Sequence, residues 1–485
     1  MPDPAATRAE LVVLRPDLVS RYDAALPGAQ SAVLTRLYGA LEREPLPGIA
    51  DKSRKAGRTS VAFGNGETVD FPTTAGEPFA HETETGDPIA LTARLWPASK
   101  LVDEIAESVA NLALARAAAT PPDLPAPGDP DSLGKIEQML VDGHPLHPCC
   151  RTRTGMSVAD VLAYAPEHRP VIRLRRLRVP AEKWHGTAQP VLYAHPWQAP
   201  RLQARYPWLT SAGVTRPVRP LMSLRTVAPV SGGPHIKTAV DIQMTSAVRT
   251  VSPAAVHNGP RLSALLTRLT ADLPLDVLTE TAAGAVITEH GPDRRLAFLT
   301  RQAPRLGPGE TAIPLGVLAT APVLQKTVDD PYTFMGLLGS VLFAPLARVL
   351  DRGVALEAHG QNTLIVLAEG RPVRSLYRDL GGVRVDATRH RDLGLIGDLP
   401  TDDPAELRTK LAAAALGATA LQLITALARH RGAEPGKLWR ILAEALHDTG
   451  PLLTDPLPIK ATTAMRLATD PLADQWTHLP NPMAA

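Results

Sequence analysis

The residues of this chain best suited to chemistry lie in short motifs between residues 143 and 379. The first motif, GHPLHPCCRTRTG at residues 143–155, joins two His-Pro pairs, which form a rigid turn, to two arginines. Zinc binding by His144 and His147 is disfavoured, because apart from two adjacent cysteines no thiolate or carboxylate stands at a ligand spacing. We favour anion binding by His144, Arg151 and Arg153, with a purely structural turn as the alternative.

A second group of residues combines hydroxyls with positive charges. Ser223, Arg225 and Thr226 lie in SLRT, and Lys237 follows in PHIK. We expect Ser223 and Arg225 on one face of a strand and Lys237 on a neighbouring strand. Hydroxyl, guanidinium and ammonium groups together can hold a triphosphate without a P-loop. No GxxxxGK[ST] sequence and no strand-flanked GxGxxG sequence occurs, so the common nucleotide motifs are absent.

Two further motifs offer groups for a carboxylate substrate. Arg249 in TSAVR, residues 245–249, can clamp a carboxylate with two parallel hydrogen bonds. In EAHGQN, residues 357–362, an extended chain would place Glu357, His359 and Gln361 on one side, although a solvated hairpin edge would look the same.

A set of oxygen ligands can also be read from the sequence. Asp379 follows a predicted strand and adds a second carboxylate to the side chains of Glu357 and Asn362. Oxygen ligands of this kind are what Mg²⁺ prefers, so the three residues are a candidate magnesium site.

The elements that must position these residues follow from hydrophobic periodicity and from the places of proline and glycine. A Pro- and Gly-rich loop at residues 121–131 suggests a domain boundary. A strand at 236–244 would place Val240, Ile242 and Met244 on one face, and Glu369-Gly370 would turn one strand into the next. The predicted helices are 29–41, 101–119, 332–350 with an interruption at Pro345, 405–431 and 437–447; the predicted strands are 171–179, 236–244, a hairpin of 354–359 with 363–368, and a strand near 373.

Composition excludes several classes of protein. The net charge of +2 and a charged fraction of 21% argue against a polyelectrolyte, and 44% hydrophobic residues suffice for two or three cores. Residues 169–225 hold eleven Lys or Arg against one acid, but too few aromatics for stacking bases, so we expect no nucleic-acid partner. No apolar run of about 18 residues occurs, and the two cysteines are adjacent. We therefore expect a cytoplasmic protein with neither a membrane partner nor a disulfide framework.

Taken in order, these motifs resemble those of one family. Together with YAPEH at 164–168 and AHPWQ at 194–198, they look like the NRPS-independent siderophore synthetases of the IucA/IucC family over residues 137–379, with a weaker likeness at KATTAMRL, 460–467. The resemblance implies an α+β, hand-like, three-domain fold with mixed and antiparallel sheets and a helical C-terminal part. The expected domains are a thumb-like domain at 1–130, fingers at 131–300 and a palm at 301–485.

The resemblance also implies a reaction. ATP and Mg²⁺ would serve to adenylate a carboxylate of citrate or a related polycarboxylic acid, releasing pyrophosphate. An amine, a hydroxylamine-bearing amine or an alcohol would then displace AMP to give an amide or ester. The resemblance further implies a homodimer. Two alternatives remain open, namely a shortened member that makes an amide in a non-siderophore natural product, and a binding homologue without catalysis.

Site residues are carried over from the family position by position. Arg249, His359 and Lys237 would be catalytic, and Arg249, His359 and Thr245 would contact the carboxylate substrate. The ATP-binding set would be His144, Arg153, Ser223, Arg225, Thr226, Lys237, Gln361 and Asp379, and the metal ligands would be Glu357, Asn362 and Asp379. Arg151 stands where the family usually has Lys, His168 stands where an aromatic residue is common, and the chain is shorter than typical members.

Overall fold

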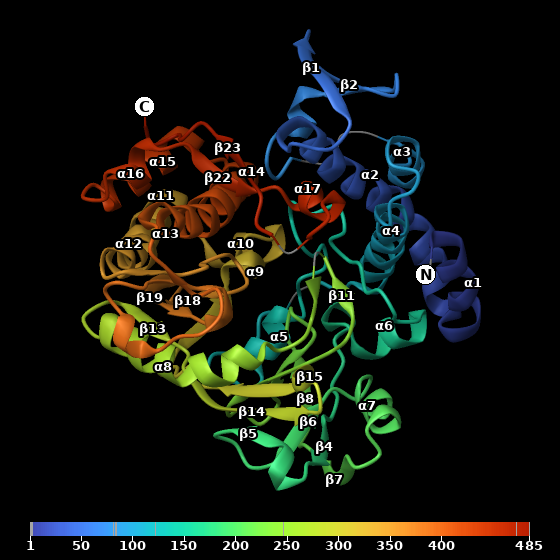
Figure 1. Ribbon diagram of the computed structural model, residues 1–485. Coiled ribbons are helices and arrows are strands. Elements are labelled where there is room, and N and C mark those ends of the chain that lie inside the picture. The colour runs from blue at the N-terminus through green and yellow to red at the C-terminus, as the bar shows by residue number, and fades with distance from the viewer. Residues whose placement is uncertain are drawn as a thin grey trace.

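The computed structural model describes residues 3–80, 82, 85–121, 123–245, 247–471 and 473–484, and Figure 1 shows three groups of elements around a common centre. The N-terminal part, residues 3–118, pairs long helices with a small antiparallel sheet of order β1-β2-β3. Asp3 and Asp87 cap the first turns of α1 and α3 with their side chains. The elements are α1 (Pro4–Leu14), α2 (Val19–Arg43), β1 (Ile49–Lys55), β2 (Arg58–Phe63), β3 (Thr68–Pro72), α3 (Pro88–Leu95) and α4 (Leu101–Ala118).

Besides a two-stranded sheet of β11 and β12, the middle part, residues 132–301, contains two sheets. The larger has the order β5-β14-β15-β10-β9-β8 and is antiparallel throughout, and the smaller has the order β6-β4-β7. The helices are α5 (Ser132–Glu137), α6 (Val158–Tyr164), α7 (Ala199–Arg205) and α8 (Pro253–Leu269). The strands are β4 (Arg175–Arg178), β5 (Trp184–Gly186), β6 (Val191–Ala194), β7 (Thr210–Val214), β8 (Val218–Pro220), β9 (Thr226–Pro229), β10 (His235–Thr238), β11 (Gln243–Met244), β12 (Ala247–Val248), β14 (Glu280–Thr288) and β15 (Gly291–Arg301).

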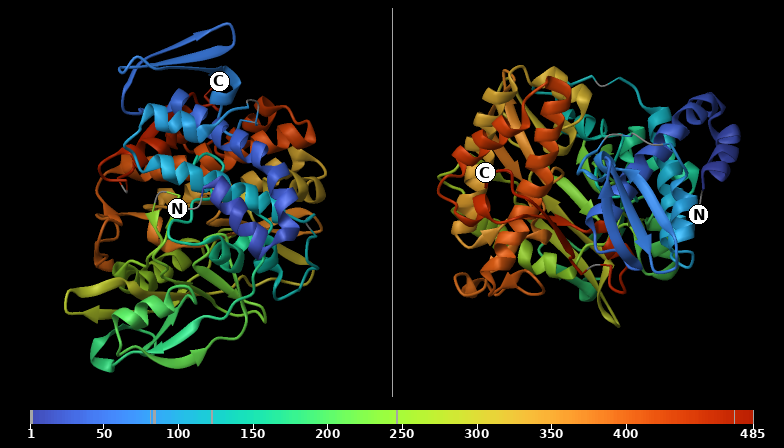
Figure 2. Two further views of the ribbon diagram at one scale, coloured as in Figure 1. Left: turned by 90° about the vertical axis from the view of Figure 1, so that its right-hand side faces the viewer. Right: turned by 90° about the horizontal axis from the view of Figure 1, so that it is seen from above.

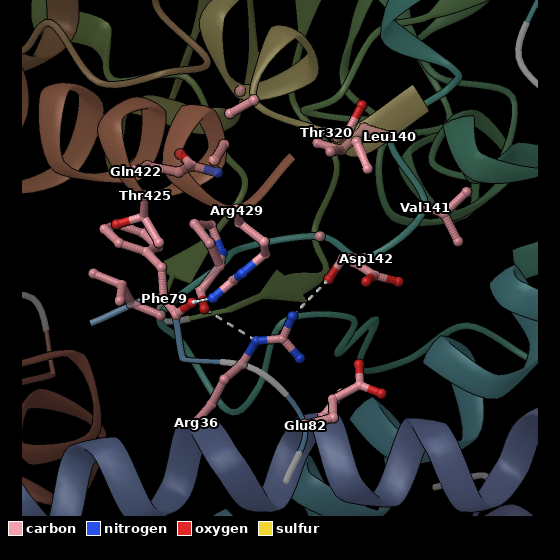
Figure 3. Close-up of a pocket in the computed structure, with 18 of the residues that line it drawn as sticks. Arg36, Phe79, Glu82, Leu140, Val141, Asp142, Thr320, Gln422, Thr425 and Arg429 are labelled. Atoms are coloured by element: carbon pink, nitrogen blue, oxygen red, sulfur yellow. Dashed lines mark hydrogen bonds between the residues drawn. The ribbon is translucent and has the colours of Figure 1, made fainter. Parts of the chain in front are cut away.

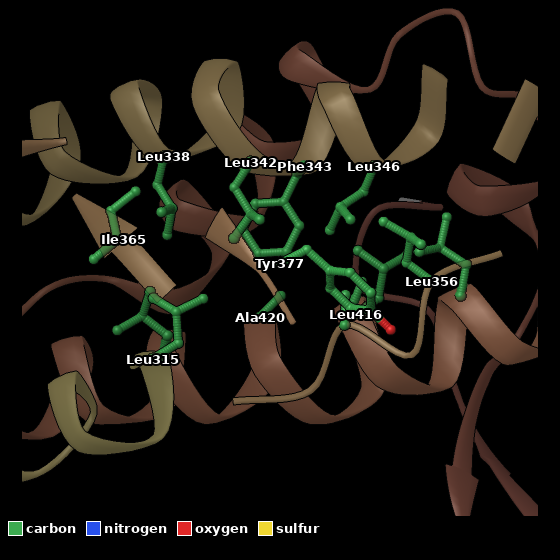
Figure 4. Close-up of a cluster of buried hydrophobic side chains, with 14 of the residues drawn as sticks. Leu315, Leu338, Leu342, Phe343, Leu346, Leu356, Ile365, Tyr377, Leu416 and Ala420 are labelled. Atoms are coloured by element: carbon green, nitrogen blue, oxygen red, sulfur yellow. The ribbon is translucent and has the colours of Figure 1, made fainter. Parts of the chain in front are cut away.

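The C-terminal part is a sheet of order β13-β19-β18-β16 covered by helices. Figure 4 shows its core, in which leucines of α11 and α12 pack over Tyr377 and Ile365 and against Leu416 and Ala420. The strands are β13 (Leu275–Val277), β16 (Glu310–Pro314), β17 (Val354–Ala355), β18 (Thr363–Ala368), β19 (Arg371–Tyr377), β20 (Arg384–Asp386) and β21 (Pro400–Thr401). The helices are α9 (Leu315–Leu318), α10 (Ala321–Thr327), α11 (Pro331–Leu338), α12 (Ala344–Asp351), α13 (Pro404–Leu411), α14 (Leu421–Arg431), α15 (Pro435–Ala445) and α16 (Pro451–Thr454).

Two π-helical stretches continue these helices. Gly339–Phe343 joins α11 to α12, so the predicted helix is continuous and Pro345 falls in the first turn of α12. Ala412–Ala420 joins α13 to α14, and a Cβ on Gly417 would lie 2.3 Å from the backbone oxygen of Pro458, so glycine lets strand β22 cross the helix at this point. The continuous helices Pro331–Asp351 and Pro404–Arg431 are long and apolar enough, by length and composition alone, to span a membrane. In the most apolar window of each helix, 56% and 72% of the window, respectively, is buried inside the protein.

The last residues return to the beginning of the chain (Figures 1 and 2). Here β22 (Leu457–Lys460) pairs with β23 (Trp476–Leu479), and α17 (Thr462–Leu467), which holds the last six residues of KATTAMRL, packs against α2. The Glu44 carboxylate accepts the N–H groups of Thr463 and Ala464 at 2.8 and 2.7 Å. Arg466 forms a buried ion pair with Glu104 of α4. Chain segments therefore cross between the expected domains, whose bounds remain a prediction.

Several predicted elements are confirmed and one is wrong. The helices at 29–41, 101–119 and 437–447 correspond to α2, α4 and α15, and Glu369-Gly370 joins β18 to β19. Val240, Ile242 and Met244 are buried as predicted, although the strand is interrupted between β10 and β11. The hairpin of 354–359 with 363–368 is wrong, because β17 pairs with β20 and β18 pairs with β16 and β19. Cys149 and Cys150 are buried free thiols.

Candidate functional site

The SLRT motif forms a tight turn instead of a strand. Leu224 has a φ of +64°, and the Ser223 hydroxyl accepts the Thr226 N–H at 3.2 Å. The expected strand face shared by Ser223 and Arg225 is therefore wrong, because β9 begins only at Thr226. Lys237 does lie on the neighbouring strand, where it pairs directly with Thr226. Positive φ at a branched residue is strained, and such strain persists where surrounding structure holds it.

Lys237 joins the middle part to the C-terminal part. Its ammonium donates to both carboxylate oxygens of Asp379, at 2.7 and 2.8 Å. Asp379 directly follows Arg378 at the end of β19 and has a φ of +74°. Burial alone would raise the pKa of Asp379, but Lys237 and Arg225 hold it well below its usual value. Burial lowers the pKa of Lys237, and Asp379 opposes this change. This carboxylate is therefore ionised at neutral pH.

Arg225 and Arg249 are half-buried and have no carboxylate partner among the described residues. Arg225 donates to the Thr250 carbonyl, and Arg249 donates to the Met244 carbonyl at 3.1 Å and to the Thr245 hydroxyl at 3.0 Å. The Nε atoms of both arginines are buried without a partner. Burial lowers the pKa of Arg249 to about 10, with Arg225 adding to the effect. Two neighbouring guanidinium groups with spare donors form a site for an anion.

The EAHGQN motif is a loop, so its residues do not alternate along a strand as predicted. The Glu357 carboxylate accepts the Lys410 ammonium of α13 at 2.9 Å. Asn362 donates its amide to the Glu357 carbonyl at 3.3 Å, and Gln361 donates its backbone N–H to His359 Nδ1 at 3.3 Å. Burial would raise the pKa of Glu357, but Lys410 and His359 lower it below its usual value.

Backbone hydrogen bonds fix the tautomers of His359 and His144. His144 Nδ1 accepts the N–H groups of Leu146 and His147 at 3.3 and 3.1 Å. A nitrogen that accepts these bonds carries no proton, so in both rings the proton is on Nε2. Burial lowers the pKa of both histidines, and the positive charge of Arg36 lowers that of His144 further. Both imidazoles are therefore neutral hydrogen-bond donors near pH 7.

The two arginines of the first motif are buried. Glu167 of YAPEH, whose side chain is fully buried, accepts Arg151 at 3.0 Å and Arg153 at 3.1 Å. Burial would raise the pKa of Glu167, but the two arginines hold it at about 2. Arg153 was predicted to contact ATP; the structure engages its guanidinium in this ion pair, with only Nε left without a partner. Arg151, in place of the usual Lys, also donates to the carbonyls of Leu140 and Val141.

The structure also reveals residues that sequence reasoning missed. Glu137, 1% exposed, accepts Arg378, 3% exposed, at 2.5 Å and also accepts the Met222 N–H at 3.0 Å. Arg378 donates to the Gln361 carbonyl at 3.0 and 2.8 Å. This pair therefore ties the SLRT turn to the EAHGQN loop. Lys410 was also missed, although a lysine beside a long apolar run is a detectable signal.

The candidate magnesium ligands have suitable chemistry. Among the residues that the structure describes, no three His, Cys, Asp or Glu side chains form a metal cluster. Glu357 and Asp379 lie on either side of Tyr377, which accepts the Glu357 N–H and donates to the Asp379 carbonyl, both at 3.2 Å. Mg²⁺ commonly takes one or two carboxylates together with phosphate oxygens and waters. The two carboxylates and the Asn362 amide oxygen fit this pattern. Lys410 pairs with Glu357 and Lys237 pairs with Asp379, so both lysines would compete with a metal ion for these carboxylates.

Comparison with known sequences identifies related proteins. The model of the family described as "IucA / IucC family" matches residues 132–193 and 188–320, and that of "Ferric iron reductase FhuF-like transporter" matches residues 337–482. Staphyloferrin A synthase of Staphylococcus aureus is 29% identical over 313 residues, which cover 53% of this chain and 54% of that protein. D-ornithine--citrate ligase of the same organism is 24% identical over 54% of this chain and 52% of its own length. The chain thus matches about half the length of these relatives.

Solved structures match the whole fold. The petrobactin biosynthesis protein AsbB of Bacillus anthracis superposes with a TM-score of 0.80 at 17% identity, covering 100% of this chain and 98% of AsbB. ATP-bound aerobactin synthetase IucA of Klebsiella pneumoniae superposes with a TM-score of 0.74 at 18% identity, covering 94% of this chain and 99% of IucA. The α+β fold with several sheets and a helical C-terminal part is therefore that of these siderophore synthetases. In its motifs, in the family model that matches residues 132–320 and in this fold, the chain is similar to the IucA/IucC family.

Proposed function

We propose that this protein is an ATP-dependent, AMP-forming ligase that joins a carboxylate of citrate or a related polycarboxylic acid to an amine or alcohol. The observation that carries the proposal is the pair Arg225 and Arg249, which are half-buried, close together and without a carboxylate partner among the described residues. A substrate with several negative charges would compensate these guanidinium groups. Cations standing between two anions also relieve the repulsion between ATP and the acid.

The proposed roles follow from the contacts of each residue. Lys237, Arg225, Ser223 and Thr226 would hold the phosphates, because they lie on adjoining strands and one turn. Arg249 would clamp the substrate carboxylate, with the Thr245 hydroxyl fixing the guanidinium. His359 and His144 would each donate Nε2–H to a substrate or phosphate oxygen. Arg153 would support the ATP site indirectly, because its guanidinium is held by Glu167. The Gln361 side chain would complete the proposed ATP-binding set.

A magnesium ion would be held by Glu357, Asn362 and Asp379, and when bound it would neutralise phosphate charge. In the first step a carboxylate oxygen attacks the α-phosphorus of ATP and pyrophosphate leaves. In the second step the nucleophile attacks the acyl carbon and AMP leaves with that oxygen. The cations contributed by the chain matter in both steps, because negative charge develops on phosphate oxygens and then on the acyl oxygen.

Pyrophosphate release tests the proposal. The protein is incubated with ATP, Mg²⁺ and hydroxylamine, and with citrate, 2-oxoglutarate or succinate in separate reactions. We expect pyrophosphate and a hydroxamate with at least one polycarboxylic acid and neither product without an acid. If no acid releases pyrophosphate, the ligase proposal is wrong and the binding homologue takes its place. Hydroxylamine serves as a generic nucleophile, so the assay does not depend on the natural acceptor.

The cellular context is proposed from the same chemistry. We infer a cytoplasmic enzyme of iron acquisition, because ATP is an intracellular cosubstrate and several relatives carry siderophore names. A homodimer also remains a prediction, which light scattering of the purified protein would test.

A further inference from the structure

A cavity of about 480 Å³ lies between the N-terminal and C-terminal parts. Figure 3 shows Arg36 of α2 pointing into it from below, with Arg429 and Gln422 of α14 opposite and Asp142 on one side. The volume is within the range of small-molecule sites. No residue proposed for ATP, the acid or the metal lines this cavity, which we call the Arg36 cavity.

The Arg36 cavity carries uncompensated positive charge. Four arginines line it, and each donates a hydrogen bond to a backbone carbonyl. Among the described residues, none of the four forms an ion pair with a carboxylate. Arg36 also has a buried Nη1 without a hydrogen-bond partner among the described residues. The four arginines are Arg36, Arg43, Arg169 and Arg429.

The carboxylates at the cavity do not balance this charge. Glu82 and Asp142 are both bound by Arg116, which reaches Glu82 at 2.5 Å and Asp142 at 2.9 Å. Glu77 is exposed to solvent at the edge. Counting Arg116, five arginines stand against three carboxylates among the described residues at the cavity, and this net positive charge favours an anion inside it.

Chain neighbours of one histidine of the proposed active site, and a residue bonded to a neighbour of the other, line the cavity. Gly143 and Pro145 line the cavity on either side of His144 in the chain. Gly316, also in the lining, donates its N–H at 2.9 Å to the carbonyl of Gly360, the residue after His359. A molecule anchored by Arg36 could thus extend toward the chain segments that carry these histidines.

We propose that the Arg36 cavity binds the second substrate, the amine or alcohol acceptor, through a carboxylate that this acceptor carries. The inference rests on the proposed function. It makes the acceptor an amino acid or a similar zwitterion, with its carboxylate on Arg36 and Arg429 and its nucleophile directed toward the reacting acyl group. An acceptor without a carboxylate would leave the arginines unpaired.

Calorimetric binding without ATP tests the inference directly. The probes are pairs of amines that differ by one carboxylate: ornithine and putrescine, lysine and cadaverine, and serine and ethanolamine. We expect the carboxylated member of at least one pair to bind at least tenfold more tightly. Arg36→Gln should abolish this preference, and Arg429→Gln provides a second variant. Arg21→Gln is the matched control, because Arg21 lies on the same helix and donates to the carbonyl of Ala119, a lining residue, but does not itself line the cavity.

Steady-state kinetics separates this inference from the proposed function. Arg36→Gln should raise the KM of the preferred acceptor at least tenfold and leave pyrophosphate release with acid and hydroxylamine unchanged. No preference in any pair, or a preference that survives in both variants, would overturn the inference. A preference that Arg36→Gln removes without changing the KM of the acceptor would identify an effector site and also overturn it. Failure of pyrophosphate release in wild type, with binding intact, would instead contradict the proposed function.

Discussion

Arg249 is the residue on which substrate recognition depends most in this account. Among the described residues, its guanidinium donates only to the Met244 carbonyl and the Thr245 hydroxyl, so its remaining donors are available to a carboxylate. Arg249→Ala would leave a desolvated carboxylate unpaired, at a cost of about 2 to 5 kcal/mol, or roughly 30- to several-thousand-fold in turnover.

The control for Arg249→Ala is Arg201→Ala. Arg201 donates to the Trp197 carbonyl at 2.7 Å and lies over the Trp197 ring, so it too lacks a carboxylate partner but is outside the site. We expect the control to keep wild-type turnover with citrate and hydroxylamine. An Arg249→Ala variant within about threefold of wild type, which is under 1 kcal/mol, would show that another group clamps the carboxylate.

The fixed tautomer of His359 predicts a donor instead of a base. Because Nδ1 accepts the Gln361 N–H, the proton is on Nε2, and a glutamine side chain can place an N–H near the same point. We expect His359→Ala to lower kcat/KM about 10- to 150-fold, the value of one hydrogen bond to a charged group, and His359→Gln to recover most of it. Equal losses in both variants would argue for proton abstraction by the ring.

At the scale of elements, the Glu137 and Arg378 pair positions the motifs. Glu137→Gln keeps the shape but leaves Arg378 as a buried charge without its partner, at a cost of about 3 to 5 kcal/mol. We expect a lower denaturant midpoint and a higher KM for ATP, because the SLRT turn and the EAHGQN loop both bind this pair.

Glu310→Gln is the matched control for Glu137→Gln. Glu310 also pairs with an arginine of β19, Arg374, but at the surface, with the two side chains 16% and 24% exposed. Exposed pairs contribute about 0 to 1 kcal/mol, so the control should unfold close to wild type. If both variants lose the same small stability and keep the KM for ATP, the buried pair does not position the site.

The sequence predicted the long elements better than the site geometry. Hydrophobic periodicity predicts helices α2 and α4 and the hydrophobic face of Val240, Ile242 and Met244. Burial of one face imposes this pattern on residues that are close together in the sequence. The turn at Leu224 and the EAHGQN loop do not follow, because their conformations depend on partners far along the chain, such as Glu137 and Lys410.

The family resemblance proposed the site residues but could not give their contacts. Lys237 and Asp379 are 142 residues apart, and no local pattern predicts that they pair. Arg153 has the residue type of a phosphate ligand, and only the fold reveals that Glu167 holds it. Long-range charge pairing therefore decides which cations remain free for a ligand.

At the scale of the whole molecule, the N-terminal helices and the first motif are joined through a buried acid. Glu107 of α4 accepts the Thr154 hydroxyl at 3.1 Å, and its other oxygen has no partner. Burial raises the pKa of Glu107 to about 7, which Thr154 opposes only in part. The folded protein therefore holds a proton that the unfolded chain releases near pH 4.5, and stability should fall as pH rises from about 4.5 to about 7.

Glu107→Gln should remove this part of the pH dependence. At pH 8 we expect the variant to exceed wild type by up to about 3 kcal/mol, because it never ionises. The melting temperature measured from pH 4.5 to 8 checks this expectation, with the exposed Glu444→Gln as control. A wild-type slope that persists unchanged in Glu107→Gln would assign the pH dependence to other groups.

The central claim, that this fold activates a carboxylate as an adenylate, is tested most directly by isotope transfer. The protein is given ATP, Mg²⁺, hydroxylamine and citrate labelled with ¹⁸O in its carboxylates, and the nucleotide product is analysed by mass spectrometry. Because the attacking carboxylate oxygen leaves with the nucleotide, we predict AMP that carries one ¹⁸O, formed at least 30-fold more slowly by Arg249→Ala. Unlabelled AMP, or ADP with labelled phosphate, would contradict the account.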